Sequence, residues 1–184
     1  MSSNLDDLLS TVDSLTEAGN KLPPVDQWHP ALSGDIDIRI DRNGDWFHEG
    51  DRFERQSLVK LFSSILRREG DHYFLVTPVE KWQIQVEDVP FLVSSLEVIR
   101  TDAGQALVFH TSVGDRVVAG PEHPLRIAYG ADGDIRPYLS IRGGMEGLLA
   151  RPVYYQLADC AEEVLQKEKA VQGVHSLGVF FALE

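Results

Sequence analysis

A strictly alternating segment near the start of the chain restricts the possible folds more than any other feature. Ile36, Ile38 and Ile40 alternate with charged residues, and Asn43-Gly44 follows directly. An alternation of period two is typical of a strand with one buried face, and Asn-Gly is the strongest short signal for a two-residue hairpin turn. We therefore predict a β-hairpin whose second strand covers residues 46–49.

An amphipathic helix and a further strand are predicted after this hairpin. Residues 51–54 have the spacing of a capping box, and the apolar residues behind them recur with helical period: Leu58, Leu61, Phe62, Ile65 and Leu66. Gly70 ends the predicted helix, because glycine readily takes the left-handed conformation that often follows a helix. Residues 72–77 then form a strand, which Pro78 stops.

The same order of elements is predicted again after Pro124. Residues 125–129 alternate, Asp132-Gly133 supplies a turn, and residues 138–141 return. A helix is predicted to start at Met145, to break or restart at Arg151-Pro152 and to continue to Gly173, before a last strand at 174–183. We interpret this as an internal duplication of a β-hairpin, helix and strand unit, over residues of about 36–80 and 125–183.

The segment between the two copies consists almost entirely of predicted strands, at residues 82–86, 91–100, 106–111 and 116–119. Short strands at regular turn spacing indicate a strongly bent sheet or a small barrel. The predicted fold class is α+β. We divide the chain into an N-terminal amphipathic helix (residues 4–16) with its linker, together 1–24, an N-terminal α+β domain (25–88) and a C-terminal α+β domain (89–184).

The charge balance bears on the possible partners. The chain has 184 residues, with 29 acidic and 17 basic side chains and a formal net charge of −12. A nucleic-acid backbone is a polyanion, and the sequence shows no basic patch that could overcome the repulsion. We therefore expect no binding to nucleic-acid backbones.

Three features predict a cytoplasmic protein. Cys160 is the single cysteine, so no disulfide can form within the chain. The first nine residues are acidic, whereas a signal peptide begins with basic and then apolar residues. No apolar run approaches the roughly 20 residues that span a bilayer, so no association with a membrane is expected.

The motifs of common enzymes and metal sites are missing from the sequence. The six histidines include no pair at metal-ligand spacing, and the acidic segment around Gly44 lacks the anchors of a calcium loop. The serine elbow of hydrolases and the glycine-rich loops of nucleotide-binding folds are missing as well. We therefore predict a non-enzymatic protein without a metal site, and the sequence identifies no cofactor.

One glycine-rich segment could bind an anion. Gly143 and Gly144 lie between a predicted strand and a predicted helix start, where free backbone amides and the helix dipole favour a phosphate. Arg142 and Arg151 lie close by in the sequence. The alternative is a tight strand-to-helix turn in which Arg142 pairs with an acidic residue.

Several ordered segments resemble the bacterial domain of unknown function 1285 family. They are residues 46–50, 58–69, 75–81, 86–91, 123–126 and 151–155. The resemblance implies a duplicated core, a C-terminal domain loosely similar to pleckstrin-homology-like folds, a nucleotide-like ligand between the two domains and a role in signalling.

A cleft between two such domains would be the default position of a ligand. The candidate contacts are polar or aromatic residues at the edges of the segments, together with the glycine turn: Trp46, His48, Arg55, Thr77, Glu80, Lys81, Arg126, Tyr138, Arg142, Gly143, Gly144 and Arg151. Arg142 and Arg151 are the preferred pair, because both lie beside the glycine turn.

Three functions are consistent with the sequence. The first is a regulatory protein that binds a phosphorylated, nucleotide-like small molecule and passes the change to a partner protein. The second is a scaffold whose N-terminal helix, with Leu5, Leu8 and Leu9, or whose sheet edge binds another protein. The third is a metal-independent hydrolase that uses His48 or His123 with a carboxylate such as Glu80.

Overall fold

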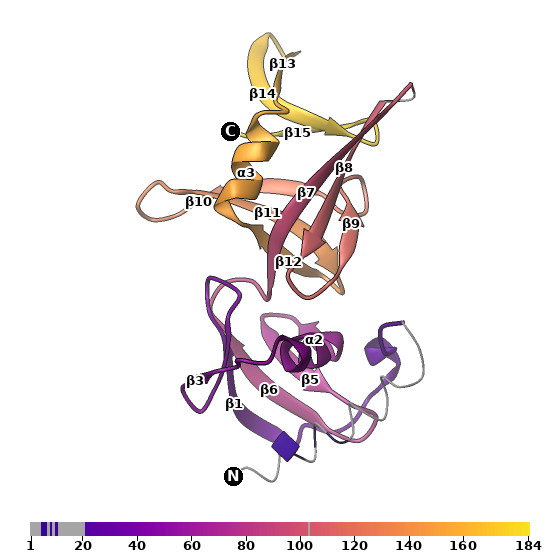
Figure 1. Ribbon diagram of the computed structural model, residues 1–184, viewed down its shortest axis with the longest axis vertical. Helices are drawn as coiled ribbons and strands as arrows, with labels where there is room; N and C mark the ends of the chain where they lie inside the picture. Colours follow the sequence, from indigo (N-terminus) through magenta and orange to yellow (C-terminus); the bar gives the residue numbers. More distant parts are fainter. Residues whose placement is uncertain (1–4, 7, 9, 11–20, 103) are drawn as a thin grey trace. The chain divides into compact units, whose positions relative to one another are not determined.

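The computed structural model describes residues 5, 6, 8, 10, 21–102 and 104–184. The chain divides into two compact units, an N-terminal domain (Met1–Asp88) and a C-terminal domain (Val89–Glu184). Each domain has its own sheet and one helix of at least two turns within the described residues (Figure 1). The fold class is α+β.

The N-terminal domain is built on one six-stranded sheet. Its elements are η1 (Val25–Gln27), β1 (Gly34–Ile40), β2 (Trp46–His48), β3 (Asp51–Arg52), α2 (Gln56–Ser64), β4 (Leu66–Glu69), β5 (His72–Val76) and β6 (Lys81–Val86). The strands lie in the order β3-β2-β1-β6-β5-β4, and β1 pairs with β6 in parallel. All other neighbours are antiparallel.

The predicted first hairpin is present. Ile38 pairs with His48 and Ile40 with Trp46 across β1 and β2, and Gly44 takes a φ of 79° in the turn. Ile38, Ile40 and Trp46 are buried, and the Trp46 ring stacks on Phe62 of α2 at 6.4 Å between centroids. The alternation thus buries one face of the hairpin under the helix.

The helix is shorter than the sequence predicts. Asp51 and Arg52 do not cap it but pair with β2 as β3, after a tight turn in which Glu49 and Gly50 have φ values of 51° and 87°. α2 begins at Gln56 and ends at Ser64, and Leu66 already belongs to β4. The capping-box prediction is therefore wrong, because pairing between strands outweighs the local capping signal.

The C-terminal domain combines a bent six-stranded sheet with a smaller one. Its elements are β7 (Phe91–Thr101), β8 (Gly104–Thr111), β9 (Arg116–Val118), β10 (Leu125–Tyr129), β11 (Ile135–Arg142), β12 (Met145–Leu149), α3 (Arg151–Ala158), β13 (Glu162–Gln166), β14 (Lys169–Ser176) and β15 (Val179–Ala182). The large sheet has the order β10-β11-β12-β7-β8-β9 and curves into a half barrel, and β13-β14-β15 form the small sheet (Figure 1).

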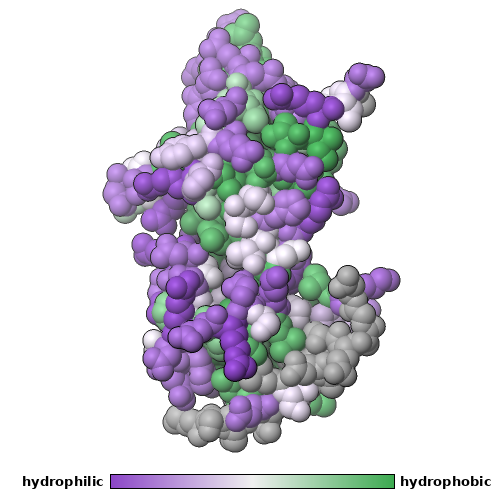
Figure 2. Space-filling model, viewed as in Figure 1, coloured by the Kyte–Doolittle hydropathy of each residue, from purple (hydrophilic) through white to green (hydrophobic). Residues whose placement is uncertain are grey.

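A buried serine joins the two sheets of this domain. Ser176 Oγ accepts a hydrogen bond from the Leu107 amide at 2.9 Å and donates one to the Ala119 carbonyl at 2.6 Å. α3 packs against β7 and β14. On the visible face, Figure 2 shows hydrophilic side chains over most of the surface and a hydrophobic area over β7 and β8.

The predicted helix from Met145 to Gly173 is wrong at both ends. Residues 145–149 form β12, which pairs with β11 and, in parallel, with β7. α3 starts at Arg151 with Pro152 in its first turn, as predicted, but it ends at Ala158. The remaining residues form a β-meander, in which two hairpin turns separate β13, β14 and β15.

The order of elements recurs, whereas the strand pairing does not. Three strands, a helix and three strands follow one another in β1–β6 with α2 and again in β10–β15 with α3. In the N-terminal segment both groups of strands join in one sheet through β1 and β6, while in the C-terminal segment β13–β15 form a separate sheet.

The predicted N-terminal helix, residues 4–16, falls largely outside the described residues. Leu5, Asp6, Leu8 and Ser10 are helical, and Leu8 is fully buried. Leu9 lies outside the described part of the chain. No helix among the residues described is both long and apolar enough to cross a bilayer.

Candidate functional site

An open groove in the N-terminal domain, with a volume of about 840 Å³, is the candidate site. It lies between the β2–β3 turn and the first turn of α2. Its lining residues are His48, Glu49, Asp51, Arg52, Phe53, Glu54, Arg55, Gln56 and Leu58. Two of these, His48 and Arg55, are among the candidates from the sequence.

Two short backbone features shape the groove. His48 and Asp51 are register partners, so Glu49 and Gly50 form a two-residue turn with positive φ at both positions. The Phe53 amide then donates to the Trp46 carbonyl at 2.9 Å, which holds the connection to α2 against β2. The chain therefore presents the turn and the helix start on the same side.

An aromatic group supports the groove from below. Phe53 is half-buried, and its ring lies 6.2 Å from the His48 ring and 5.8 Å from the Phe62 ring, measured between centroids. Phe62, a residue of α2, is completely buried. The imidazole of His48 is thus placed by packing on a rigid neighbour.

The rim of the groove carries both signs of charge. Glu49, Asp51 and Glu54 are exposed carboxylates, and Arg52 pairs with Asp45 at 2.5 Å. Arg55 is exposed and forms no ion pair with any described residue. It is also the N-cap of α2 and makes no side-chain capping bond there. The positive end of the helix dipole and a free guanidinium therefore lie at the same place.

The preferred arginine, Arg142, has a structural role. Its Nε donates to Asp115 Oδ1 at 2.8 Å, and its Cζ lies 4.7 Å from the centroid of Phe91. The side chains of Arg142 and Asp115 are only 19% and 11% exposed. The alternative considered from the sequence, a pairing of Arg142 with an acidic residue, is the correct one.

Gly143 and Gly144 form no phosphate nest before a helix. Their φ values of 58° and 71° make a two-residue hairpin turn between β11 and β12, with Arg142 opposite Met145. The predicted helix start after these glycines is wrong, because residues 145–149 form a strand, and a helix dipole therefore does not support an anion site at this turn.

Arg126 also interacts with an acidic residue and an aromatic ring of the C-terminal domain. Its guanidinium donates two hydrogen bonds of 2.6 Å to Glu146 and lies 4.2 Å above the Tyr138 ring. Tyr138 itself is only 4% exposed. Trp46, in the N-terminal domain, is a core residue at 2% exposure and offers no free ring face.

Thr77, Glu80 and Lys81 build the turn between β5 and β6. Thr77 Oγ1 accepts the Glu80 amide at 3.0 Å, and Lys81 Nζ donates to Glu69 at 3.1 Å. Burial by itself raises the pKa of Glu69, but hydrogen bonds and charge from Lys81 and Arg67 outweigh it and hold this pKa below its usual value. One Glu80 oxygen, Oε2, is buried and has no hydrogen-bond partner among the described residues.

The last candidate, Arg151, is the first residue of α3 in the C-terminal domain. It is exposed and has no ion pair within the described part of the chain. It does not line the groove. Of the twelve candidate residues, only His48 and Arg55 therefore line the groove.

No catalytic pair or metal cluster accompanies the groove. Within residues 21–102 and 104–184, neither His48 nor His123 hydrogen-bonds to a carboxylate, and His123 Nδ1 instead lies 3.0 Å from the Ser140 carbonyl oxygen. His175 does pair with Glu162, on an exposed part of the small sheet. The described residues contain no group of three potential metal ligands.

Sequence reasoning missed most of the groove. Phe53, Glu49, Asp51 and Glu54 were assigned to a strand end and a helix cap. The signal that could have shown the groove is Glu49-Gly50, because a glycine two residues after a strand favours a tight turn and hence a third strand.

Comparison with known proteins identifies the family. Residues 23–89 match the model described as domain of unknown function (DUF1285), N-terminal domain, and residues 90–183 match protein of unknown function (DUF1285), C-terminal domain. The chain therefore belongs to the DUF1285 family, which confirms the resemblance seen in the sequence. No curated protein matches the chain.

Two solved structures are similar to this chain. A DUF1285 family protein from Silicibacter pomeroyi DSS-3 is 42% identical, with 96% of this chain and 93% of that chain covered and a TM-score of 0.86. A second, from Shewanella baltica OS155, is 33% identical over 66% of this chain and 90% of that chain, with a TM-score of 0.52.

Proposed function

We propose that this chain is a non-enzymatic regulatory protein that binds a phosphorylated, nucleotide-like small molecule through the groove of the N-terminal domain. The observation that carries the proposal is the combination of an Arg55 without an ion pair to a described residue, the helix dipole of α2 and the two neighbouring rings of His48 and Phe53 along one concavity. Each feature suits one part of a nucleotide.

The size of the groove supports this ligand class. Small-molecule sites commonly have volumes of roughly 300–1,000 Å³. The observed volume of about 840 Å³ lies within this range and accommodates a mononucleotide.

The chemistry of the lining supports it as well. Arg55 and the start of α2 would receive the phosphate, since guanidinium groups and helix N-termini favour anions. Phe53 and His48 would pack against the base, and the carboxylates of Glu49 and Asp51 would accept hydrogen bonds from ribose hydroxyls. A purely anionic ligand such as inorganic phosphate would leave these carboxylates as a source of repulsion.

A regulatory role is supported because a ligand in the groove would connect the β2–β3 turn with α2. The β2–β3 turn and α2 are held together here by Phe53, and a bound nucleotide would add contacts to both. The wider expectations belong to the same proposal: a cytoplasmic signalling protein, a duplicated core and a pleckstrin-homology-like second domain, with the ligand in the groove of the N-terminal domain in place of the expected position between the domains. The recurring order of elements supports the duplication.

The test is thermal unfolding of the full chain with adenosine and guanosine mono-, di- and triphosphates and with inorganic phosphate. A ligand at 100 times its dissociation constant stabilises the folded state by about 2.7 kcal/mol, which raises the melting temperature by roughly 5–11 °C for a chain of this size. Arg55→Ala should remove the shift, and Arg116→Ala, an exposed arginine of β9, should keep it.

Two outcomes would contradict the proposal. One is that no nucleotide shifts the melting temperature of the unmodified chain. The other is that Arg55→Ala and Arg116→Ala behave alike, which would place any binding outside the groove.

A scaffold function is the second candidate, and a specific observation favours it. Tyr129, Ile135 and Tyr155 are exposed by 59%, 44% and 58% on the C-terminal domain. Large exposed tyrosines are typical of protein interfaces. The hydrolase is a weaker alternative, because His48 lacks a carboxylate partner among the described residues.

A further inference from the structure

One face of α3 carries a regular pattern of exposed side chains. Arg151, Tyr155 and Asp159 follow one another at intervals of four residues, and all three are exposed. The Asp159 amide donates to the Tyr155 carbonyl at 3.0 Å, so the helical geometry extends to Asp159. Residues four apart lie on the same helix face. The stripe therefore runs from a positive charge through an aromatic ring to a negative charge.

The charges at the two ends are unfavourable within the helix. Arg151 lies at the N-terminus, where the helix dipole is positive, and Asp159 lies at the C-terminus, where it is negative. Neither side chain forms an ion pair with another described residue.

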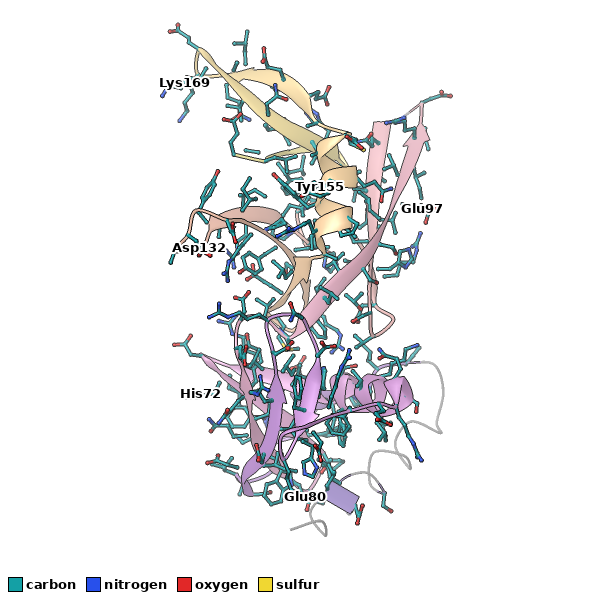
Figure 3. All side chains as sticks on the ribbon, turned by 60° about the vertical axis from the view of Figure 1, so that its left-hand side comes forward. His72, Glu80, Glu97, Asp132, Tyr155 and Lys169 are labelled. Carbon is teal, nitrogen blue, oxygen red and sulfur yellow. The ribbon has the colours of Figure 1, made fainter. Side chains whose placement is uncertain are left out.

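A hairpin end of the same domain carries two further exposed apolar side chains. Tyr129 and Ile135 are cross-strand partners at the end of β10 and β11, exposed by 59% and 44%. Burial, with a smaller contribution from nearby Tyr129, raises the pKa of Tyr154, and the Tyr154 ring lies 6.4 Å from the Tyr155 ring. Figure 3 shows Tyr155 on α3 and Asp132 in the β10–β11 turn of the same domain.

We propose that this face pairs with the same face of a second copy of the chain, with the two α3 helices antiparallel. Tyr155 then lies on the two-fold axis against the partner's Tyr155. Arg151 and Asp159 lie about 6 Å along the helix on either side of Tyr155, at 1.5 Å rise per residue. A two-fold rotation therefore brings Arg151 of each copy to the partner's Asp159.

Charge complementarity favours a second copy over an unrelated partner. An antiparallel pair supplies each misplaced end charge with an opposite charge and also sets the two helix dipoles against each other favourably. Two chains of net charge −12 repel at long range, so association needs such local compensation. The contact surface on α3 is small, because the helix has eight residues. We therefore infer a weak, concentration-dependent dimer.

The experiment is sedimentation velocity on the full chain from about 10 µM to about 1 mM, a range that spans weak association. The unmodified chain should shift from monomer toward dimer. Tyr155→Ser should abolish the shift, while circular dichroism stays unchanged because the side chain is largely exposed. Arg116→Asp, a reversal on exposed β9, is the control that should dimerise normally.

Charge reversal tests the antiparallel register. Arg151→Asp alone and Asp159→Arg alone place like charges opposite each other and should weaken association at least about tenfold. The double variant Arg151→Asp with Asp159→Arg restores both pairs and should dimerise again. An equimolar mixture of the two single variants should form a heterodimer.

Three results would overturn the proposal. The first is a chain that stays monomeric throughout the range. The second is a dimer that Tyr155→Ser and Arg151→Asp leave intact, which would place the interface elsewhere. The third is a double variant that fails to dimerise, which would exclude this register. Because no nucleotide is added, these outcomes do not depend on the proposed ligand.

Discussion

At the residue scale, the partner of an arginine decides its role. Arg142 and Arg126 each form an ion pair with a carboxylate and lie over an aromatic ring, so their charge is compensated within the C-terminal domain. Arg55 and Arg151 are exposed and have no ion pair with a described residue. These two arginines are therefore the better candidates for binding, whereas the sequence alone favours the pair of Arg142 and Arg151.

Glu69 makes the free energy of unfolding depend on pH. Its pKa is lower in the folded chain than in the unfolded chain, because Lys81 and Arg67 outweigh the effect of burial. A lowered folded-state pKa stabilises the fold above the unfolded pKa, and this stability is lost as the pH falls through the folded pKa. Glu69→Gln should therefore destabilise the chain at pH 7, by less than about 1 kcal/mol because the pair is partly exposed.

Urea unfolding at neutral and acidic pH checks this prediction. The difference between the unmodified chain and Glu69→Gln should shrink below about pH 4.3, the ordinary carboxyl pKa. Glu122→Gln, at an exposed loop position, should show no such difference. A difference that stays constant down to low pH would mean that the carboxylate charge is not the cause.

At the element scale, a turn decides whether residues 145–149 are strand or helix. The periodicity of Met145, Leu148 and Leu149 fits a helix, yet the segment is a strand in which Met145, Gly147 and Leu149 are buried. The positive φ values of Gly143 and Gly144 close a hairpin on β11, and the neighbouring β7 completes the pairing. Short apolar segments fit both periods, so turn geometry and pairing decide between them.

The turn can be tested by substitution at Gly143. Gly143→Ala should destabilise the chain by about 1–2 kcal/mol, because alanine resists the left-handed conformation. Gly143→Asn should cost little, since Asn-Gly is a preferred pair for this turn. The measurement is urea unfolding of both variants.

The same variants show whether the Gly143-Gly144 turn takes part in anion binding. Any nucleotide-induced shift in melting temperature should persist in Gly143→Ala after correction for its lower stability. Loss of the shift in this variant, together with equal stability of the alanine and asparagine variants, would contradict the hairpin-turn assignment.

At the scale of the whole molecule, each domain holds its own core. Trp46, Phe62 and Leu75 are buried in the N-terminal domain, and Phe109 and Leu139 in the C-terminal domain. The sheets do not continue from one domain into the other, since every strand pair joins strands of the same domain. Each domain thus has the parts of an independent folding unit.

Residues 89–184, expressed alone, should therefore unfold cooperatively in urea with a β-rich circular dichroism spectrum. Phe109→Ala in this fragment should cost about 3–5 kcal/mol, because the side chain is fully buried. A fragment that lacks a cooperative transition would show that the C-terminal domain depends on the rest of the chain.

The sequence by itself determined the elements whose signals are local. Alternation with Asn43-Gly44 specified the first hairpin, and Pro152 specified the start of α3, because these patterns depend on neighbours in the chain. The α+β class and the family follow from such segments.

Only the tertiary structure decided the site and the strand partners. Asp51 and Arg52 became a strand because β2 was available to pair with them, and Arg142 was taken by Asp115, 27 residues away. The groove exists because this third strand places the Glu49-Gly50 turn beside α2. Local preferences fix the period of a segment, but contacts between distant residues contribute the free energy that selects its partner.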